Sequence, residues 1–287
     1  MAVVLGGGNG IYLASFAGPT PPPALDPDAV AFLSAAGITD PTIESAVNTL
    51  VVDMKAANIW TKMKAVYPFV GGTASTHKWN LINPLDTDAA FRLVFNGGLT
   101  HSANGVLPNG TNGYAKTFLS TGISVFPRTT GISMGYYSRT TGSHASGGNV
   151  MGSFNSSASS SRMLIRYIGA PNTSVFSHNY NDGINPNARY TSDATGSGFY
   201  IGNRKASDSE LYINGSLVAS NTDGNTTLNP PTETAYLFAY NNKNINATTF
   251  TNKECALAHI SDALTTTLPA EWTSIVQNFQ TILGRQI

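Results

Sequence analysis

Residues 210–220, ELYINGSLVAS, decide the fold expected of this chain. At their centre, Asn214 and Gly215 form the dipeptide that most readily takes the positive φ angles of a two-residue type I′ turn. The apolar runs on both sides predict a β-hairpin whose facing pairs are Ile213 with Ser216, Tyr212 with Leu217, and Leu211 with Val218. One face then carries Leu211, Ile213 and Val218, and the other carries Tyr212 and Leu217. The second face is either a binding platform or a surface that the protein itself covers.

Short apolar or alternating runs of the same character continue from about Tyr67 onwards. Examples are KWNLI, FRLVFN, RMLIRYI and CALAHI, and turn-forming clusters such as NGG, PNGTNG and NDGINPN separate them. Many short strands separated by such turn-forming clusters favour an antiparallel β-sandwich. No period of 20 to 50 residues stands out, which disfavours a propeller or a β-helix. We therefore expect one β-sandwich domain over residues 67–287.

Helices are expected before this domain, over residues 26–66. Asp26 and Asp40 each stand as a capping residue before a proline at the first helical position. After the second cap, one apolar stripe recurs at three- and four-residue spacing, namely Ile43, Val47, Leu50, Val51 and Met54. A shorter helical piece is expected to continue through Trp60, Met63 and Lys64. The stripe predicts an attachment region that docks on the following domain; a self-associating bundle is the alternative.

The two remaining segments differ in kind. Residues 1–25 are Gly-rich and then Pro-rich, and consecutive prolines favour extended polyproline II, so we expect an N-terminal arm or linker. The final twenty residues, LPAEWTSIVQNFQTILGRQI, predict an amphipathic helix with Gly284 as a candidate C-cap. Its apolar stripe consists of Trp272, Ile275, Val276, Phe279 and Leu283.

Composition limits the partners. Charged residues make up 11% of the chain, against about 25% in ordinary soluble domains, and 16 basic residues balance 16 acidic ones. No Lys and Arg cluster interleaves with aromatic residues, so nucleic acid is not an expected partner. No polybasic patch or long apolar span predicts membrane insertion. The single cysteine, Cys255, cannot form an intramolecular disulfide and is expected to be a buried small hydrophobe.

Catalytic carboxylates are the first chemistry to seek in a sandwich of this kind. A retaining glycosidase needs two carboxyl groups about 5 Å apart, commonly in a Glu-x-Asp-x-x-Glu pattern on one strand. None of the five glutamates fits that pattern: Glu44, Glu210, Glu233, Glu254 and Glu271. Asp86 and Asp88 are the closest acidic pair, and capping of a helix or turn explains them. We therefore expect no enzyme and nominate no catalytic residue.

Histidine and glycine patterns give no further site. The histidines lack metal-binding spacing such as His-x-x-x-His, and they are His77, His101, His144, His178 and His259. His259 alternates with Leu257 and is expected in the core or on a sheet face. The N-terminal GGGNG lacks the Lys-Ser/Thr of a phosphate loop, so no nucleotide cofactor is expected.

Calcium is the one candidate cofactor. The segment HNYNDGINPN offers four oxygen-donor side chains, Asn179, Asn181, Asp182 and Asn185. Calcium prefers several carboxylates, and this loop supplies only Asp182. The alternative is ordinary turn chemistry, in which Asn and Asp bond to their own backbone.

Tyrosines are the most numerous candidates for contact with a ligand or partner. They could stack on sugar rings or anchor a protein interface, or they could simply fill the core and the sheet surfaces. The candidates are Tyr136, Tyr137, Tyr167, Tyr180, Tyr190, Tyr200, Tyr212, Tyr236 and Tyr240.

Three runs carry a resemblance to a known fold. GFYIGNRKASDSELYINGSLVAS, then AYLFAYNN and ECALAHISDALT, resemble the late strands of concanavalin-A-like jelly rolls, particularly their laminin-G-like branch. The expected fold class is thus mainly β, an antiparallel jelly-roll β-sandwich with a short N-terminal helical region and a C-terminal amphipathic helix.

A second resemblance suggests a biological setting. FVGGTASTHKWNLINPLDTDAAFRLVFNGG, together with the terminal NFQTILGRQ, is similar to virion proteins of tailed bacteriophages. It implies a non-enzymatic structural component, a fibre, tail or capsid decoration protein, made in the host cytoplasm and displayed on the particle exterior. The arm and helices would contact other virion proteins, the chain would form a homo-oligomer, and a host-surface glycan is a candidate partner. The alternatives are a carbohydrate-binding lectin module and a polysaccharide-degrading enzyme.

Overall fold

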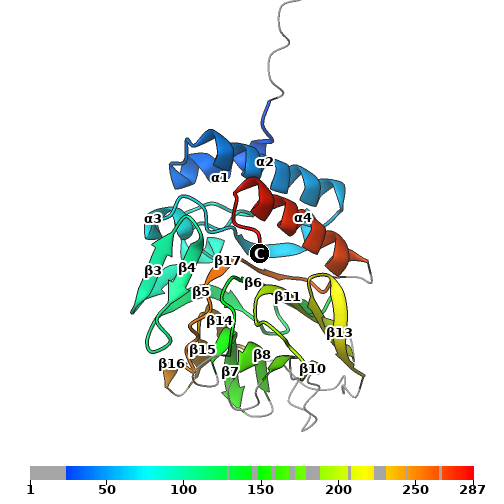
Figure 1. Ribbon diagram of the computed structural model, residues 1–287. Coiled ribbons are helices and arrows are strands. Elements are labelled where there is room, and N and C mark those ends of the chain that lie inside the picture. Colours follow the sequence, from blue (N-terminus) through cyan, green and yellow to red (C-terminus); the bar gives the residue numbers. More distant parts are fainter. Residues whose placement is uncertain are drawn as a thin grey trace, which may run out of the picture.

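The computed structural model describes residues 24–127, 129–143, 148–156, 159–167, 172–178, 188–205, 208–222, 231–243, 245–264 and 267–287. Within them, two antiparallel sheets lie face to face as a β-sandwich, and helices lie over the outer side of one sheet (Figure 1). The expected fold class, mainly β with a helical region before the sandwich and a helix after it, is confirmed. Residues 1–23 of the expected arm lie outside the described residues.

The sheet under the helices, here called sheet A, contains eight strands. Their order is β13-β12-β11-β6-β17-β4-β3, and β1 pairs with β17 beside this path. The strands span Met63–Tyr67 (β1), Leu99–Ser102 (β3), Gly105–Pro108 (β4), Ile132–Ser138 (β6), Gly198–Lys205 (β11), Asp208–Ile213 (β12), Ser216–Asn221 (β13) and Cys255–Ser261 (β17).

The opposite sheet, sheet B, contains nine strands. Their order is β10-β9-β8-β7-β14-β5-β2, and β15 pairs with β16 and, in parallel, with β7. The strands span Val94–Asn96 (β2), Tyr114–Ser120 (β5), Asn149–Ser156 (β7), Ser159–Tyr167 (β8), Thr173–His178 (β9), Ala188–Tyr190 (β10), Thr234–Leu237 (β14), Tyr240–Asn242 (β15) and Asn246–Thr248 (β16).

The three longest helices of the described residues, α1, α2 and α4, lie where the sequence predicts, whereas the short α3 was not predicted. Asp26 and Asp40 cap α1 and α2 by accepting hydrogen bonds from backbone N–H groups of the first turn. In α4, Gly284 takes φ 65° just beyond the helix end, and its N–H donates to the Thr281 carbonyl, as expected of a C-terminal glycine. The helical elements are α1 Pro27–Ala36, α2 Pro41–Ala56, α3 Ala74–His77 and α4 Leu268–Ile282, with 3-10 turns at Trp60–Lys62 (η1) and Asp88–Ala90 (η2).

Two apolar cores hold these layers together. The inter-sheet core lies between sheets A and B and includes Tyr136 and Phe176. The helix-side core lies between sheet A and the helices and includes Tyr137 of β6, Leu50 of α2 and Trp272 of α4. The predicted docking of the α2 stripe onto the rest of the chain is thus confirmed, with Val47, Leu50, Val51 and Met54 buried and Ile43 partly buried.

The hairpin that decided the fold forms β12 and β13. Asn214 and Gly215 take φ 49° and 80°, and Ile213 faces Ser216 and Tyr212 faces Leu217, as predicted. The third pair is wrong, because a β-bulge places Leu211 opposite Ala219 instead of Val218. Tyr212 is buried in the helix-side core, whereas Leu217 is 53% exposed. The second face of the hairpin is therefore covered at Tyr212 and open at Leu217.

The expected helical piece after α2 is also wrong in part. Trp60 begins a 3-10 turn, but Met63 and Lys64 belong to β1, which pairs with β17 in sheet A. The pairing with a buried strand outweighs the local helical spacing of these residues. The division of the chain at residues 25 and 66 stays a prediction.

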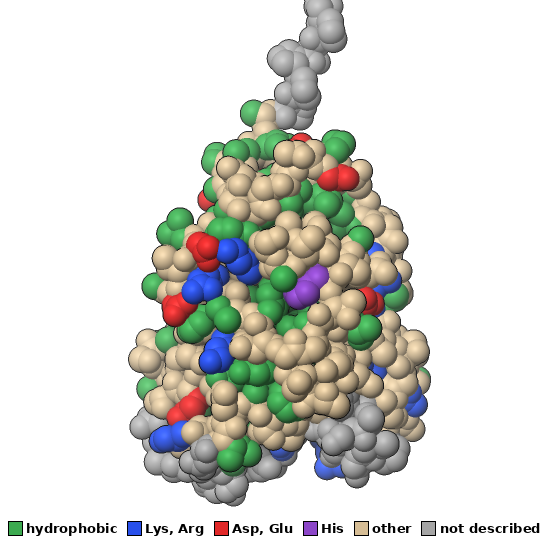
Figure 2. Space-filling model, turned by 90° about the vertical axis from the view of Figure 1, so that its left-hand side faces the viewer, with side chains coloured by type: hydrophobic (Ala, Val, Ile, Leu, Met, Phe, Trp, Pro, Cys, Tyr) green, Lys and Arg blue, Asp and Glu red, His purple; other side chains and the backbone are tan. Residues whose placement is uncertain are grey.

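The surface matches the composition. The face drawn in Figure 2 is mostly neutral and polar, with scattered charged side chains, as the charged fraction of 11% leads us to expect. None of the described helices is both long and apolar enough to span a membrane.

Candidate functional site

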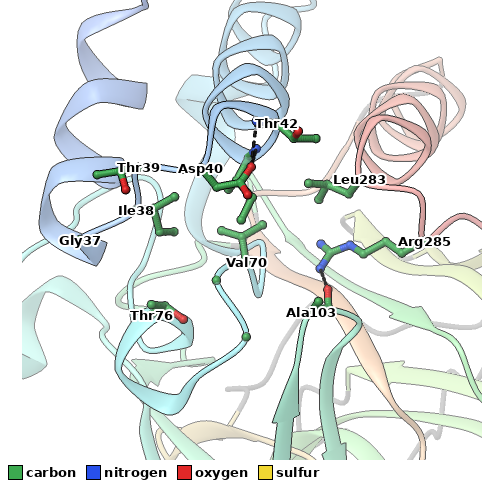
Figure 3. Close-up of a pocket in the computed structure, with 13 residues that line it drawn as sticks. Gly37, Ile38, Thr39, Asp40, Thr42, Val70, Thr76, Ala103, Leu283 and Arg285 are labelled. Atoms are coloured by element: carbon green, nitrogen blue, oxygen red, sulfur yellow. Dashed lines mark hydrogen bonds between the residues drawn. The ribbon is translucent and has the colours of Figure 1, made fainter.

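A cavity of about 600 Å³ opens where the helical layer meets one edge of the sandwich (Figure 3). Segments far apart in the sequence form its walls: the α1–α2 connection, the loop between β1 and α3, the β3–β4 turn and the end of α4. Its volume lies within the range usual for small-molecule sites, roughly 300–1,000 Å³. The lining residues are Gly37, Ile38, Thr39, Asp40, Thr42, Ile43, Val70, Gly71, Gly72, Thr76, Ala103, Leu283 and Arg285.

The first wall carries polar groups that are free to bind. Asp40 uses Oδ1 to cap α2, accepting from the backbone N–H of Thr42 at 2.8 Å and of Ile43 at 3.1 Å. Among the described residues, nothing bonds to the second carboxylate oxygen of Asp40 or to the hydroxyls of Thr39 and Thr42. All three residues are exposed. The wall therefore offers one carboxylate oxygen and two hydroxyls to a ligand.

The opposite wall is a tight backbone turn. Gly71 and Gly72 both take left-handed backbone angles, φ 87° and 75°, which a residue with a Cβ rarely adopts. A Cβ at Gly71 would also lie 2.8 Å from the Cβ of Thr76. Thr73 and Thr76 form a reciprocal capping box at the start of α3, which fixes this turn against the short helix.

Arg285 closes the inner end of the cavity, and all five of its N–H groups are used. Nε donates to the Gln280 side-chain carbonyl, and Nη1 and Nη2 donate to four backbone carbonyls, those of Pro68, Phe69, Ala103 and Ala256. The side chain is 2% exposed, and burial lowers the pKa of its guanidinium to about 9. Arg285 thus joins three walls of the cavity and has no donor left for a ligand.

Apolar side chains complete the cavity. The lining includes Ile38, Ile43, Val70 and Leu283, and Figure 3 shows Val70 between Asp40 and Arg285. The only ionisable side chains in the lining are Asp40 and Arg285. A glycosidase canonically uses two carboxyl groups, and this lining supplies one, together with hydroxyls and apolar side chains.

The acidic pair singled out in the sequence lies outside the cavity. Asp86 Oδ2 accepts from Lys78 Nζ at 2.6 Å, and Asp88 Oδ1 pairs with Arg92 Nη2 at 2.9 Å. The capping explanation is wrong, because the residue before η2 is Thr87 and no side chain caps that turn. Both carboxylates instead form ion pairs with nearby cationic side chains, which the local sequence pattern did not reveal.

The predicted core histidine is confirmed. His259 is fully buried, and the Trp272 indole N–H donates to its Nδ1 at 3.1 Å. Burial lowers its pKa to about 3. His178 is also fully buried, with Nδ1 2.9 Å from the Ser161 hydroxyl, and burial lowers its pKa to about 3. His144 lies outside the described residues.

The other two histidines form a pair that the sequence did not predict. His77 ends α3 and His101 lies on β3, yet their Nδ1 atoms are 3.0 Å apart. They are separated by 24 positions, and only the fold brings α3 beside β3. No spacing signal in the sequence could have revealed this pair.

No metal centre lies in the described part of the chain, where no three His, Cys, Asp or Glu side chains are grouped closely enough to hold an ion. The candidate calcium ligands Asn179, Asn181, Asp182 and Asn185 lie outside the described residues, so that site stays a prediction. Cys255 is buried as expected, and burial raises the pKa of its thiol.

Most candidate tyrosines are structural. Tyr136, Tyr137 and Tyr200 are fully buried, and Tyr212, Tyr236 and Tyr240 are each 6% exposed. Tyr190 is partly buried against the inter-sheet core. Tyr180 and the side chain of Tyr167 are outside the described set. The interpretation of these rings as core and sheet surface is confirmed for the six buried ones.

Comparison with known proteins gives structural neighbours only. No protein-family model matches the sequence, and no curated protein matches it. The binding domain of botulinum neurotoxin DC, in complex with rat synaptotagmin II, superposes with a TM-score of 0.50 at 12% identity, over 76% of this chain and 52% of that one. This likeness shows a shared β-sandwich fold, and the chain spans about half the length of that binding domain.

Two further structures are similar over parts of the chain. The binding domain of botulinum neurotoxin serotype C1 gives a TM-score of 0.48 at 11% identity, covering 78% of this chain and 53% of that one. The Ruminococcus gnavus IT-sialidase CBM40 gives 0.36 at 13% identity, over 51% of this chain and 84% of that one.

Proposed function

We propose that the protein is a non-enzymatic recognition module that binds carbohydrate in the cavity between the helical layer and the β3–β4 edge. The observation that carries the proposal is the wall of free polar groups, Thr39, Asp40 and Thr42, beside an apolar surface. A sugar ring presents the matching chemistry, because its hydroxyls both donate and accept hydrogen bonds and its C–H faces are apolar.

The hydrogen bonds available suit a neutral polyol. Each threonine hydroxyl can donate once and accept, and the free oxygen of Asp40 accepts a charge-assisted hydrogen bond from a hydroxyl. Ile38, Val70 and Leu283 would cover the apolar face of the ring. Arg285 fixes the walls opposite these polar groups through its hydrogen bonds to Pro68, Phe69 and Ala103, so binding would cost little conformational entropy there.

The fold likeness is compatible with recognition of a receptor. The botulinum neurotoxin DC binding domain, which shares the sandwich, is in complex with rat synaptotagmin II. A sandwich of this kind can therefore serve as a binding domain, while the ligand of the present chain must follow from its own cavity.

A glycan array tests the proposal. We expect the wild-type protein to bind a subset of glycans and Thr39→Val combined with Thr42→Val to lower that signal at least tenfold, because two hydrogen bonds of about 1 kcal/mol each are removed. Asp40→Asn keeps the helix cap and removes the charge, so it should weaken binding without unfolding α2. Thr61→Val makes the same chemical change at an exposed position of η1 outside the cavity and is the matched control.

An array that stays silent with and without calcium would contradict the proposal. Binding that survives the threonine double variant would place any carbohydrate site elsewhere. The virion role, the exterior location on a phage particle and the homo-oligomer stay predictions that rest on sequence resemblance alone.

A further inference from the structure

A chain of hydrogen bonds runs outward from the rim of the cavity. The backbone N–H of Gly72, which lines the cavity, donates to Nε2 of His77 at 3.2 Å. Nδ1 of His77 lies 3.0 Å from Nδ1 of His101. His77 is 1% exposed, whereas His101 is half-buried. The chain therefore connects the cavity wall to a surface imidazole.

The geometry fixes which nitrogen carries each proton. Nε2 of His77 accepts from an amide, so the proton of the neutral ring must be on Nδ1. That Nδ1–H then donates to Nδ1 of His101, which leaves the His101 proton on Nε2. Among the described residues, nothing accepts a hydrogen bond from Nε2 of His101. The tautomer of this surface ring is thus fixed, with one donor unused.

Both imidazoles are kept neutral by their surroundings. Burial, together with electrostatic repulsion by the neighbouring His101 and Arg285, lowers the pKa of His77 to about 3, and burial lowers the pKa of His101 below its usual value. A metal bridging the two Nδ1 atoms does not fit this arrangement, because the Gly72 amide leaves the proton of His77 on Nδ1.

The surroundings of His101 favour contact with a ligand. The Phe95 ring of β2 lies 4.6 Å from the His101 ring, centroid to centroid, at 74°. His101 is the only described histidine more than 1% exposed, and Figure 2 shows a histidine at the surface among hydrophobic side chains. Two residues of the cavity lining lie close to this region, because a Cβ at Gly72 would lie 3.4 Å from the backbone nitrogen of Ala103, and Ala103 follows His101 by two positions.

We propose that the binding site extends from the cavity across the Gly72 and Ala103 rim to His101, whose Nε2–H donates to an oxygen of a second sugar residue. Phe95 lies beside that second residue and covers its apolar face. The inference rests on the proposed carbohydrate binding and specifies the ligand class as an oligosaccharide of at least two residues. A single sugar residue would occupy only the cavity.

The first test is independent of any ligand. A long-range proton–nitrogen correlation spectrum of protein labelled with ¹⁵N-histidine should show the Nδ1–H tautomer for His77 and the Nε2–H tautomer for His101 at pH 7. A charged His101, or a His101 with its proton on Nδ1, would overturn the inference.

The second test compares two probes, the oligosaccharide with the strongest array signal and the free monosaccharide from its non-reducing end. His101→Phe should weaken oligosaccharide binding about tenfold and leave monosaccharide binding unchanged, whereas His101→Gln, which keeps an N–H donor, should restore most of it. Thr100→Val, at the exposed neighbouring position of β3, is the control. Thermal melting checks that each variant is folded.

The outcomes separate the two proposals. If His101→Phe leaves oligosaccharide binding intact while the Thr39 and Thr42 double variant abolishes it, the extension to His101 is wrong and the cavity remains the site. If His101→Phe weakens both probes equally, His101 belongs to the monosaccharide site and the extension is again wrong. If neither probe binds, the proposed function fails and the extension fails with it.

Discussion

Strand β6 of sheet A and strand β5 of sheet B differ in how their outer faces are covered, and the difference explains how the sequence encodes the layers at these strands. β6 of sheet A is buried at every position, so Tyr136 enters the inter-sheet core while its neighbour Tyr137 enters the helix-side core. β5 of sheet B alternates between buried and half-buried positions along its whole length. A strand that is covered on both faces can be apolar at successive positions, whereas a strand with one face exposed to water alternates apolar and polar residues. The cavity lies at the edge of the helical cover.

Lowering the pH should give the largest loss of unfolding free energy, because three histidines are buried in the folded protein. The pKa values of His77, His178 and His259 are all about 3 in the folded protein, against 6.5 normally. Below pH 6.5 the unfolded chain therefore binds protons that the folded chain does not. Each histidine should cost about 1.4 kcal/mol of unfolding free energy per pH unit as the pH falls from 6.5 towards 3.

Urea denaturation at pH 7.5, 6.0 and 5.0 measures this slope. Since domains are stable by only about 5–15 kcal/mol, we expect unfolding to become pronounced near pH 5. His259→Gln removes one of the three groups, so the slope should fall by about one third. A stability that stays flat from pH 7.5 to 5.0 would mean that these rings are not buried and neutral.

Trp272→Ala should give the next largest effect, because it breaks the helix-side core. Trp272 of α4 is fully buried against Phe199 of β11 and His259 of β17, and its indole N–H donates a hydrogen bond to His259. Removing a buried ring of this size costs about 3–5 kcal/mol. Circular dichroism in urea measures the loss, and Ser274→Ala, on the exposed side of α4, should change it by less than about 0.5 kcal/mol.

The shape of the same transition tests whether the two cores unfold together. A single cooperative step is expected, because sheet A belongs to both cores. A separate early transition in Trp272→Ala would show that the helical layer opens on its own.

Arg285→Lys should give an intermediate effect at the junction of the two regions. A lysine has three donors in place of five, so at least two of the five carbonyls that Arg285 bonds, four of the backbone and one of the Gln280 side chain, would lose their partner. We expect a loss of about 2–3 kcal/mol in unfolding free energy and weaker ligand binding, since the cavity walls share this anchor. Gln286→Ala, at the exposed next residue, is the control for urea denaturation. A loss below about 1 kcal/mol would mean that other contacts hold the walls.

The sequence predicted the elements better than the site. The Asn214-Gly215 turn, the two Asp-Pro caps and the apolar stripe of α4 are local signals, and local chemistry determines them. The bulge at Val218 is set by pairing across the hairpin, which turn chemistry does not reveal. The cavity and the His77–His101 pair combine residues from distant segments, so residue spacing along the chain cannot predict them.

Lys116→Ala should give the smallest change in unfolding free energy, and it tests the outer face of β5. Lys116 lies on β5, half-buried, between Val94 and Tyr236 on the neighbouring strands. A side chain at the water boundary should contribute within about 0.5 kcal/mol to unfolding, measured in urea at two protein concentrations tenfold apart. A larger loss that grows with protein concentration would show that another copy of the chain covers this face in solution. Strand β5 would then be covered as β6 is, by a second subunit in place of helices, and the alternation along β5 would mark an interface.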